Sequence, residues 1–106
     1  MYCLIVWDKE LAATGQDGSL RKAEIPADLA KFFFELDSEE FPILSSLSFD
    51  DYDLFSDTQL ESLAHELLQA AKVNPSASNF IASLVKFILE AKYLKKSVLF
   101  DPFRKE

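Results

Sequence analysis

The stretch FFFELDSEEFPILSSLSFDDYDLFSDTQLESLAHELLQAA, which spans Phe32–Ala71, organises this chain of 106 residues. Its forty residues carry ten carboxylates and no Lys or Arg, and seven aromatic residues lie among them. Acidic segments that stay solvated contain few aromatics, so this composition favours a folded acidic surface that binds a basic partner. The acids are Glu35, Asp37, Glu39, Glu40, Asp50, Asp51, Asp53, Asp57, Glu61 and Glu66.

Helical periodicity is found within this stretch and on both sides of it. Apolar residues recur at helical spacing over Pro26–Leu36, and a second apolar face runs through Leu60–Ala71 after a capping signal at Ser56. Ser76 or Ser78 begins a last long helix. The apolar residues of that helix cover more than one stripe, so we expect it to be the central and most buried one.

Shorter elements are expected near the two ends of the chain. Tyr2–Trp7 is apolar and rich in β-branched and aromatic residues, which favours a buried strand, and Ser97–Phe100 is a candidate terminal strand. Leu20–Ile25 reads as an extended segment, Lys9–Ala13 as one helical turn and Phe41–Leu47 as a short helix. The predicted fold is mainly α, with three to four helices and, if the two end segments pair, a small two-stranded sheet.

Length and charge restrict the class of protein. The length fits one compact domain over residues 1–106. The net charge is −7 and is unevenly spread, with −1 in residues 1–31, −10 in residues 32–71 and +5 in residues 72–105. The acidic middle repels nucleic acid and anionic membranes, so neither is an expected partner. The apolar runs are too short to span a membrane and no signal-peptide pattern is present, so we expect a cytoplasmic location.

Few catalytic chemistries fit the composition. The only glycines, Gly15 and Gly18, do not belong to a phosphate-binding loop, and one Cys with one His does not make a zinc site. Cys3 lies in an apolar run, which is typical of a buried inert thiol, and the alternative is a nucleophile paired with His65. We therefore expect no enzyme activity, no catalytic residues, no cofactor and no metal.

The segment Phe49–Phe55 admits three interpretations. A calcium loop that starts at Asp51 would have Phe55 at position five and Ser62 at position twelve, where oxygen ligands with charge are needed. A carboxylate pair for acid–base catalysis needs a cleft and opposed pKa values, which a sequence does not show. A recognition loop fits best, because carboxylates accept bidentate bonds from Arg and Tyr52 offers a large apolar anchor.

In its size, helical make-up, lone cysteine and acidic aromatic segment from Phe32 to Glu66, the chain resembles the small acidic immunity proteins of bacterial toxin–immunity systems, such as contact-dependent growth inhibition. The resemblance implies a cytosolic antitoxin that binds one cognate toxin, a ribonuclease or other nuclease, and blocks its active site. Nuclease toxins are basic because they hold phosphate backbones, so a negative inhibitor gains both association rate and complementarity.

The charge argument, rather than the resemblance, selects the candidate partner-binding residues. Asp51 and Asp53 are expected to contact Lys or Arg, so reversing both to Lys should weaken binding with little change in thermal stability. Three alternatives stay open: a solvated acidic face, an acidic regulatory adaptor or nucleic-acid mimic that inhibits a DNA-binding protein, and an enzyme built on scattered carboxylates. The full set is Glu39, Glu40, Asp50, Asp51, Tyr52, Asp53, Asp57 and Glu61.

Overall fold

A computed structural model describes residues 2–103 of the chain. Within them, four strands form one antiparallel sheet in the order β2-β1-β4-β3. The strands are β1 (Tyr2–Trp7), β2 (Ser19–Ile25), β3 (Asp53–Phe55) and β4 (Ser97–Asp101). The helices are α1 (Lys9–Ala13), α2 (Ala27–Phe34), α3 (Thr58–Val73) and α4 (Ser78–Tyr93), with 3-10 turns at Leu44–Ser46 and Pro75–Ala77.

The prediction of a mainly α fold is wrong, because the sheet has four strands rather than two. The two end segments do pair, and β1 runs antiparallel to β4 with Leu4 opposite Phe100. The extended segment expected at Leu20–Ile25 is β2, which pairs with the other side of β1. β3 lies inside the segment interpreted as a recognition loop and pairs with β4. Three residues are too few to show a periodicity, so only the pairing identifies this strand.

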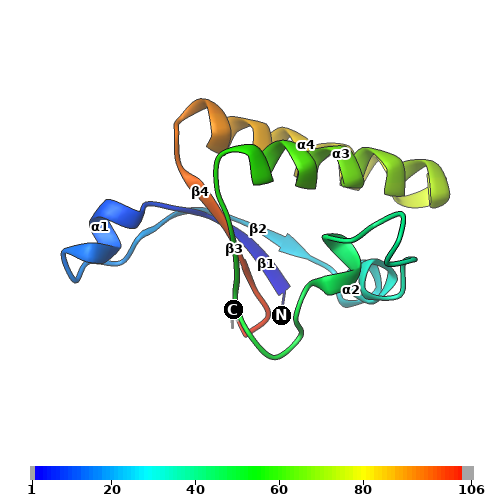
Figure 1. The fold of residues 1–106 in the computed structure, drawn as a ribbon, viewed down its shortest axis with the longest axis horizontal. Helices are drawn as coiled ribbons and strands as arrows, with labels where there is room; N and C mark the ends of the chain where they lie inside the picture. Colours follow the sequence, from blue (N-terminus) through cyan, green and yellow to red (C-terminus); the bar gives the residue numbers. More distant parts are fainter. Residues whose placement is uncertain (1, 104–106) are drawn as a thin grey trace.

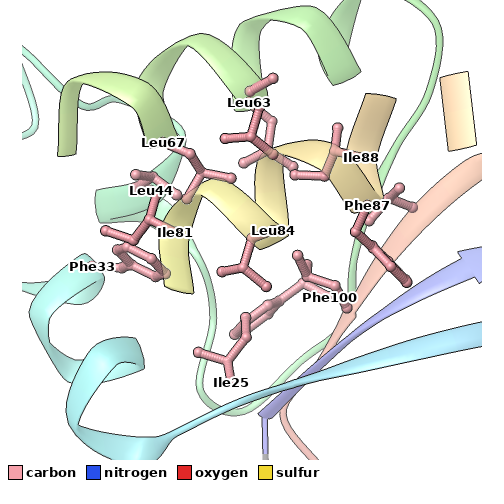
Figure 2. Close-up of a cluster of buried hydrophobic side chains, with 14 of the residues drawn as sticks. Ile25, Phe33, Leu44, Leu63, Leu67, Ile81, Leu84, Phe87, Ile88 and Phe100 are labelled. Atoms are coloured by element: carbon pink, nitrogen blue, oxygen red, sulfur yellow. The ribbon is translucent and has the colours of Figure 1, made fainter. Parts of the chain in front are cut away.

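Both long helices, α3 and α4, cover the same face of the sheet (Figure 1). Side chains alternate between the two faces of a strand, so Leu4 of β1 and Phe100 of β4 point towards the helices. They join one buried cluster with the inner faces of α3 and α4, to which α2 adds Phe33 (Figure 2). In residues 2–103, no long helix covers the opposite face of the sheet (Figure 1).

Two further expectations about helices are corrected. The short helix predicted over Phe41–Leu47 is only the 3-10 turn Leu44–Ser46. The last helix, α4, is not more buried than α3, because each helix buries one side against the sheet and the other side faces out. The apolar residues of α4 that lie off the inner stripe, including Leu89 and Tyr93, are exposed. Extra apolar positions on a helix therefore do not by themselves indicate burial.

The start of α3 follows the predicted capping signal only in part. The Gln59 side chain accepts a hydrogen bond from the Ser56 backbone N–H at 3.0 Å, which is one half of a capping box. The Ser56 hydroxyl is instead hydrogen-bonded to the Ser97 hydroxyl of β4 at 2.7 Å. The helix begins at Thr58, after Asp57 at a φ of 53°. The serine hydroxyl thus ties the start of α3 to the sheet.

Asp8 joins three elements at the α1 end of the molecule. Its Oδ1 caps α1 by accepting from the backbone N–H groups of Glu10 and Leu11 at 2.9 and 3.1 Å. Its Oδ2 accepts from Lys96 Nζ, just before β4, at 3.0 Å. A side chain at Gly18 would place its Cβ 2.7 Å from the Asp8 carbonyl oxygen, so this close approach requires glycine.

Replacing Asp8 by Asn should lower the melting temperature at neutral pH but not in strong acid. The hydrogen bond from Lys96, helped by that from the Leu11 N–H, lowers the pKa of Asp8. The ion pair therefore stabilises the fold above the unfolded-state pKa of about 3.9 and is lost as pH falls through the lower folded value. Thermal unfolding from about pH 7 to about pH 2 measures this, since Asn keeps the cap but removes the charge. Glu10→Gln, in the same turn, is the control. A difference in melting temperature between Asp8→Asn and the wild type that stays constant at all pH values would contradict the assignment.

Candidate partner-binding surface

The net negative charge comes entirely from one segment of the fold. Residues 26–56 contain eight acids and one base, Lys31, whereas the rest of the chain contains ten acids and ten bases. The segment comprises α2, the turn that follows it, the 3-10 turn Leu44–Ser46, the connection to β3 and β3 itself. In Figure 1, α2 and the chain that leaves it lie at the end of the molecule opposite α1. Two of the ten bases outside residues 26–56, Arg104 and Lys105, are not among the described residues.

Residues 48–52, which we call the acidic loop, present two aromatic rings with two carboxylates between them in the sequence. Phe49 is 68% exposed and Tyr52 is 53% exposed, and both Asp50 and Asp51 are exposed. The rings rest on neighbours: Phe49 on Phe34 with 6.4 Å between centroids, and Tyr52 edge-on to Phe103 at 5.3 Å. Contacts with neighbouring rings therefore hold the exposed aromatic side chains of the loop in place.

A second group of acids lies in the turn after α2, residues 37–40, which we call the acidic turn. The Asp37 carboxylate accepts from the Glu39 N–H at 3.0 Å, and the Asp37 carbonyl accepts from the Phe41 N–H at 2.8 Å. Phe41 is buried and anchors the turn, which leaves Glu39 and Glu40 exposed. Within residues 2–103, no carboxylate of the acidic loop or the acidic turn forms an ion pair.

Two of the ten acids of Phe32–Ala71 have a structural role inside the fold. Glu66 is only 7% exposed, and its carboxylate accepts from the backbone N–H groups of Ile43 and Leu44 at 3.0 to 3.1 Å. It thereby holds the 3-10 turn against α3. Asp53 is half-buried, and its Oδ2 accepts from the Ser48 N–H at 2.9 Å, which closes the base of the acidic loop. Asp53 positions the loop, so its carboxylate is already engaged.

The start of α3 is electrostatically different from the acidic loop. Glu61 forms an ion pair with Lys92 of α4. Asp57 lines a cavity of about 170 Å³ together with Lys9, Lys95 and Lys96. These two acids therefore face the basic end of α4, where their charge is offset. The fold separates them from the uncompensated acids of the acidic loop and the acidic turn.

The helix-free face of the sheet holds a cavity that the sequence reading missed. Its floor is Ile5, Leu99 and Leu54, which stand in register across β1, β4 and β3. The cavity has a volume of about 390 Å³. The other lining residues are two aromatics, two carboxylates and a serine: Trp7, Tyr52, Asp17, Asp101 and Ser19. No Lys or Arg of the described residues lines it.

One sequence signal indicates that this face of the sheet is buried at β1. Cys3–Trp7 is apolar at every position, a pattern typical of a strand buried on both faces and not of one with a solvated face. Cys3 and Ile5 are fully buried although they do not face the helices. Tyr52 belongs to both the acidic loop and the cavity wall, so the two features form one continuous surface.

Comparison of the chain with protein-family models, with curated proteins and with solved structures finds no significant match. No group of three or more His, Cys, Asp or Glu side chains within residues 2–103 is placed to hold a metal ion. Over the same residues, no helix is both long enough and apolar enough to cross a membrane. The alternative of Cys3 as a nucleophile lacks its geometry, because Cys3 is buried in β1 and His65 is exposed on α3.

Proposed function

We propose that this chain is a cytoplasmic immunity protein that binds and neutralises a basic toxin of the nuclease class. The observation that carries the proposal is the acidic loop, where two exposed aromatic rings stand beside carboxylates without intramolecular ion pairs. Large aromatic side chains with few rotatable bonds are the usual energetic anchors of protein interfaces. A protein that displays them beside uncompensated charge is suited to a partner of the opposite charge.

The charge distribution supports a basic partner. All of the net charge lies in residues 26–56, so the field is concentrated at one region and does not surround the molecule. Such a field steers a basic protein towards that region and speeds its association at low ionic strength. A nuclease is basic where it holds the phosphate backbone, so carboxylates docked there exclude the nucleic acid substrate.

The cavity on the helix-free face supports a more specific contact. Its apolar floor suits the methylene stem of a Lys or Arg, and its carboxylates and aromatic rings suit the cationic head. We infer that one basic side chain of the toxin enters it beside Tyr52. Asp17→Asn tests this contact, because it removes the charge and keeps an acceptor for the Ser19 N–H.

The test is capture of the toxin and inhibition of its nuclease activity. The tagged protein is incubated at low salt with extract of its own host, and retained proteins are eluted with a salt gradient. We expect one basic polypeptide that degrades nucleic acid when isolated and stops doing so when the pure protein is added back. Elution at moderate salt would agree with a contact dominated by charge.

Other outcomes contradict the proposal and separate it from its rivals. A retained DNA-binding regulator without nuclease activity would favour the acidic adaptor or nucleic-acid mimic. A retained nuclease that stays active in the complex would exclude neutralisation. If host extract known to contain an expressed basic toxin yields no bound protein, the acidic residues are a solvated face.

A further inference from the structure

The outer side of α4 is an apolar surface on the far side of the helical layer from the sheet. Tyr93 is 86% exposed and Leu89 is 47% exposed, and Leu68 of α3 and Leu94 after α4 are about half exposed. These residues line a groove of about 630 Å³ with few polar atoms. Contiguous apolar patches on soluble proteins usually mark an interaction site, because leaving them in water is unfavourable.

The outer stripe of α4 has a spacing that reads the same in both directions. It consists of Ala82, Lys86, Leu89 and Tyr93, separated by four, three and four residues. Residues at this spacing share one face of a helix. In an antiparallel pair of α4 helices related by a two-fold axis, Ala82 would meet Tyr93 of the second copy, and Lys86 would meet Leu89. The smallest side chain would thus face the largest and most exposed one.

The charges on this face are complementary to themselves. Lys86 and Glu90 are one helical turn apart, and the same antiparallel alignment brings Lys86 of each copy beside Glu90 of the other. Glu90 also accepts from Arg21 at 2.5 Å, but a carboxylate accepts from two cations at once. The stripe together with Glu90 carries no net charge, so this face is not matched to a basic toxin.

We propose that the protein forms a two-fold symmetric homodimer through the outer face of α4. A two-fold interface uses the same patch on both copies, which the palindromic spacing and the paired charges satisfy. The excess acids of residues 26–56 belong to other elements, so their mutual repulsion does not oppose this contact directly. One helix face buries less than the ~800 Å² per partner of standard interfaces, so we expect a micromolar dissociation constant. This inference does not depend on the identity of the toxin.

The decisive experiment mixes two charge variants. Lys86→Glu places two carboxylates together at each contact, and Glu90→Lys places two ammonium groups together, so each variant alone should be monomeric by sedimentation velocity. In an equal mixture, both contacts of the heterodimer again join a carboxylate and an ammonium group. We expect the mixture to dimerise within a few-fold of the wild-type constant. A change in folding of one variant cannot mimic this recovery.

A second pair of variants tests the apolar part of the face. Leu89→Lys should weaken the dimer at least tenfold, since it places an ammonium group opposite Lys86 of the other copy at both contacts. Val73→Lys is the matched control, because Val73 is also exposed and apolar but lies at the end of α3. The inference is overturned if the wild type stays monomeric at high micromolar concentration, if the mixture stays monomeric, or if Leu89→Lys dimerises normally. A monomer whose toxin binding requires Leu89 would assign the face to the toxin instead.

Discussion

Reversal of Asp50 and Asp51 to Lys should weaken binding of the captured nuclease about a hundredfold at low salt, or ~3 kcal/mol. Both carboxylates are exposed and lie between the two exposed aromatic residues in the sequence, so reversal places like charges in the contact. The melting temperature should change little, because the one bond lost is between Asp51 and its neighbouring N–H at an exposed position. Titration calorimetry at low and high salt measures the effect, which should shrink as salt screens the charges.

The control for this prediction changes net charge by the same amount elsewhere. Glu10→Lys with Glu24→Lys reverses two exposed acids on α1 and β2, outside residues 26–56. We expect a loss of only a few-fold, mainly in the association rate. An equal loss in both double variants would mean that only total charge matters and would refute a local site. Asp53→Lys should instead reduce stability, because it removes the acceptor of the Ser48 N–H.

Replacement of Glu66 by Ala should lower the free energy of unfolding by about 3 kcal/mol. The substitution removes the acceptor of the Ile43 and Leu44 N–H groups in a largely buried position. These donors then have no partner in the fold, and an unsatisfied buried group costs more than the hydrogen bond itself contributes. Urea unfolding near neutral pH measures the difference, with the slope checked for a change in the surface exposed on unfolding.

Two further glutamate variants test whether the effect comes from the buried carboxylate of Glu66. Glu66→Gln keeps one acceptor oxygen and should retain about half of the lost stability. Glu61→Ala removes an exposed glutamate, five residues earlier in α3, that pairs with Lys92 and with no other base of residues 2–103, so it should cost less than about 1 kcal/mol. Equal effects for Glu61→Ala and Glu66→Ala would show that the buried carboxylate does not hold the 3-10 turn.

Much of the secondary structure was predictable because its signals are local. The apolar run Tyr2–Trp7 and the turn Lys9–Ala13 have the predicted bounds, and the sequence pattern places both ends of α2 and α3 and the start of α4 within two residues. The number of strands was underestimated because β2 is charged at Arg21, Lys22 and Glu24 and β3 has three residues. Whether such segments are strands depends on the partner strand, which lies far away in the sequence.

The candidate surface also has features that the sequence predicts and features that depend on the tertiary structure. The acidic loop and the acidic turn contain the exposed, uncompensated acids that the charge pattern emphasised. The sequence could not separate them from Asp53 and Glu66, which hold backbone N–H groups, or from Glu61, which pairs with α4. Whether a carboxylate is free depends on donors brought close by folding, and the donor to Glu61 is thirty-one residues away.

The sequence by itself determined the acidic character of the middle of the chain, the helix stripes and the apolar first strand, because each is a property of neighbouring residues. Tertiary structure alone decided that this strand lies inside a four-stranded sheet and that the cavity beside Tyr52 opens on its free face. It also decided that the surplus apolar residues of α4 face outwards. Burial requires a partner surface, and α4 has only one sheet face to pack on, so half of its circumference stays available for another molecule.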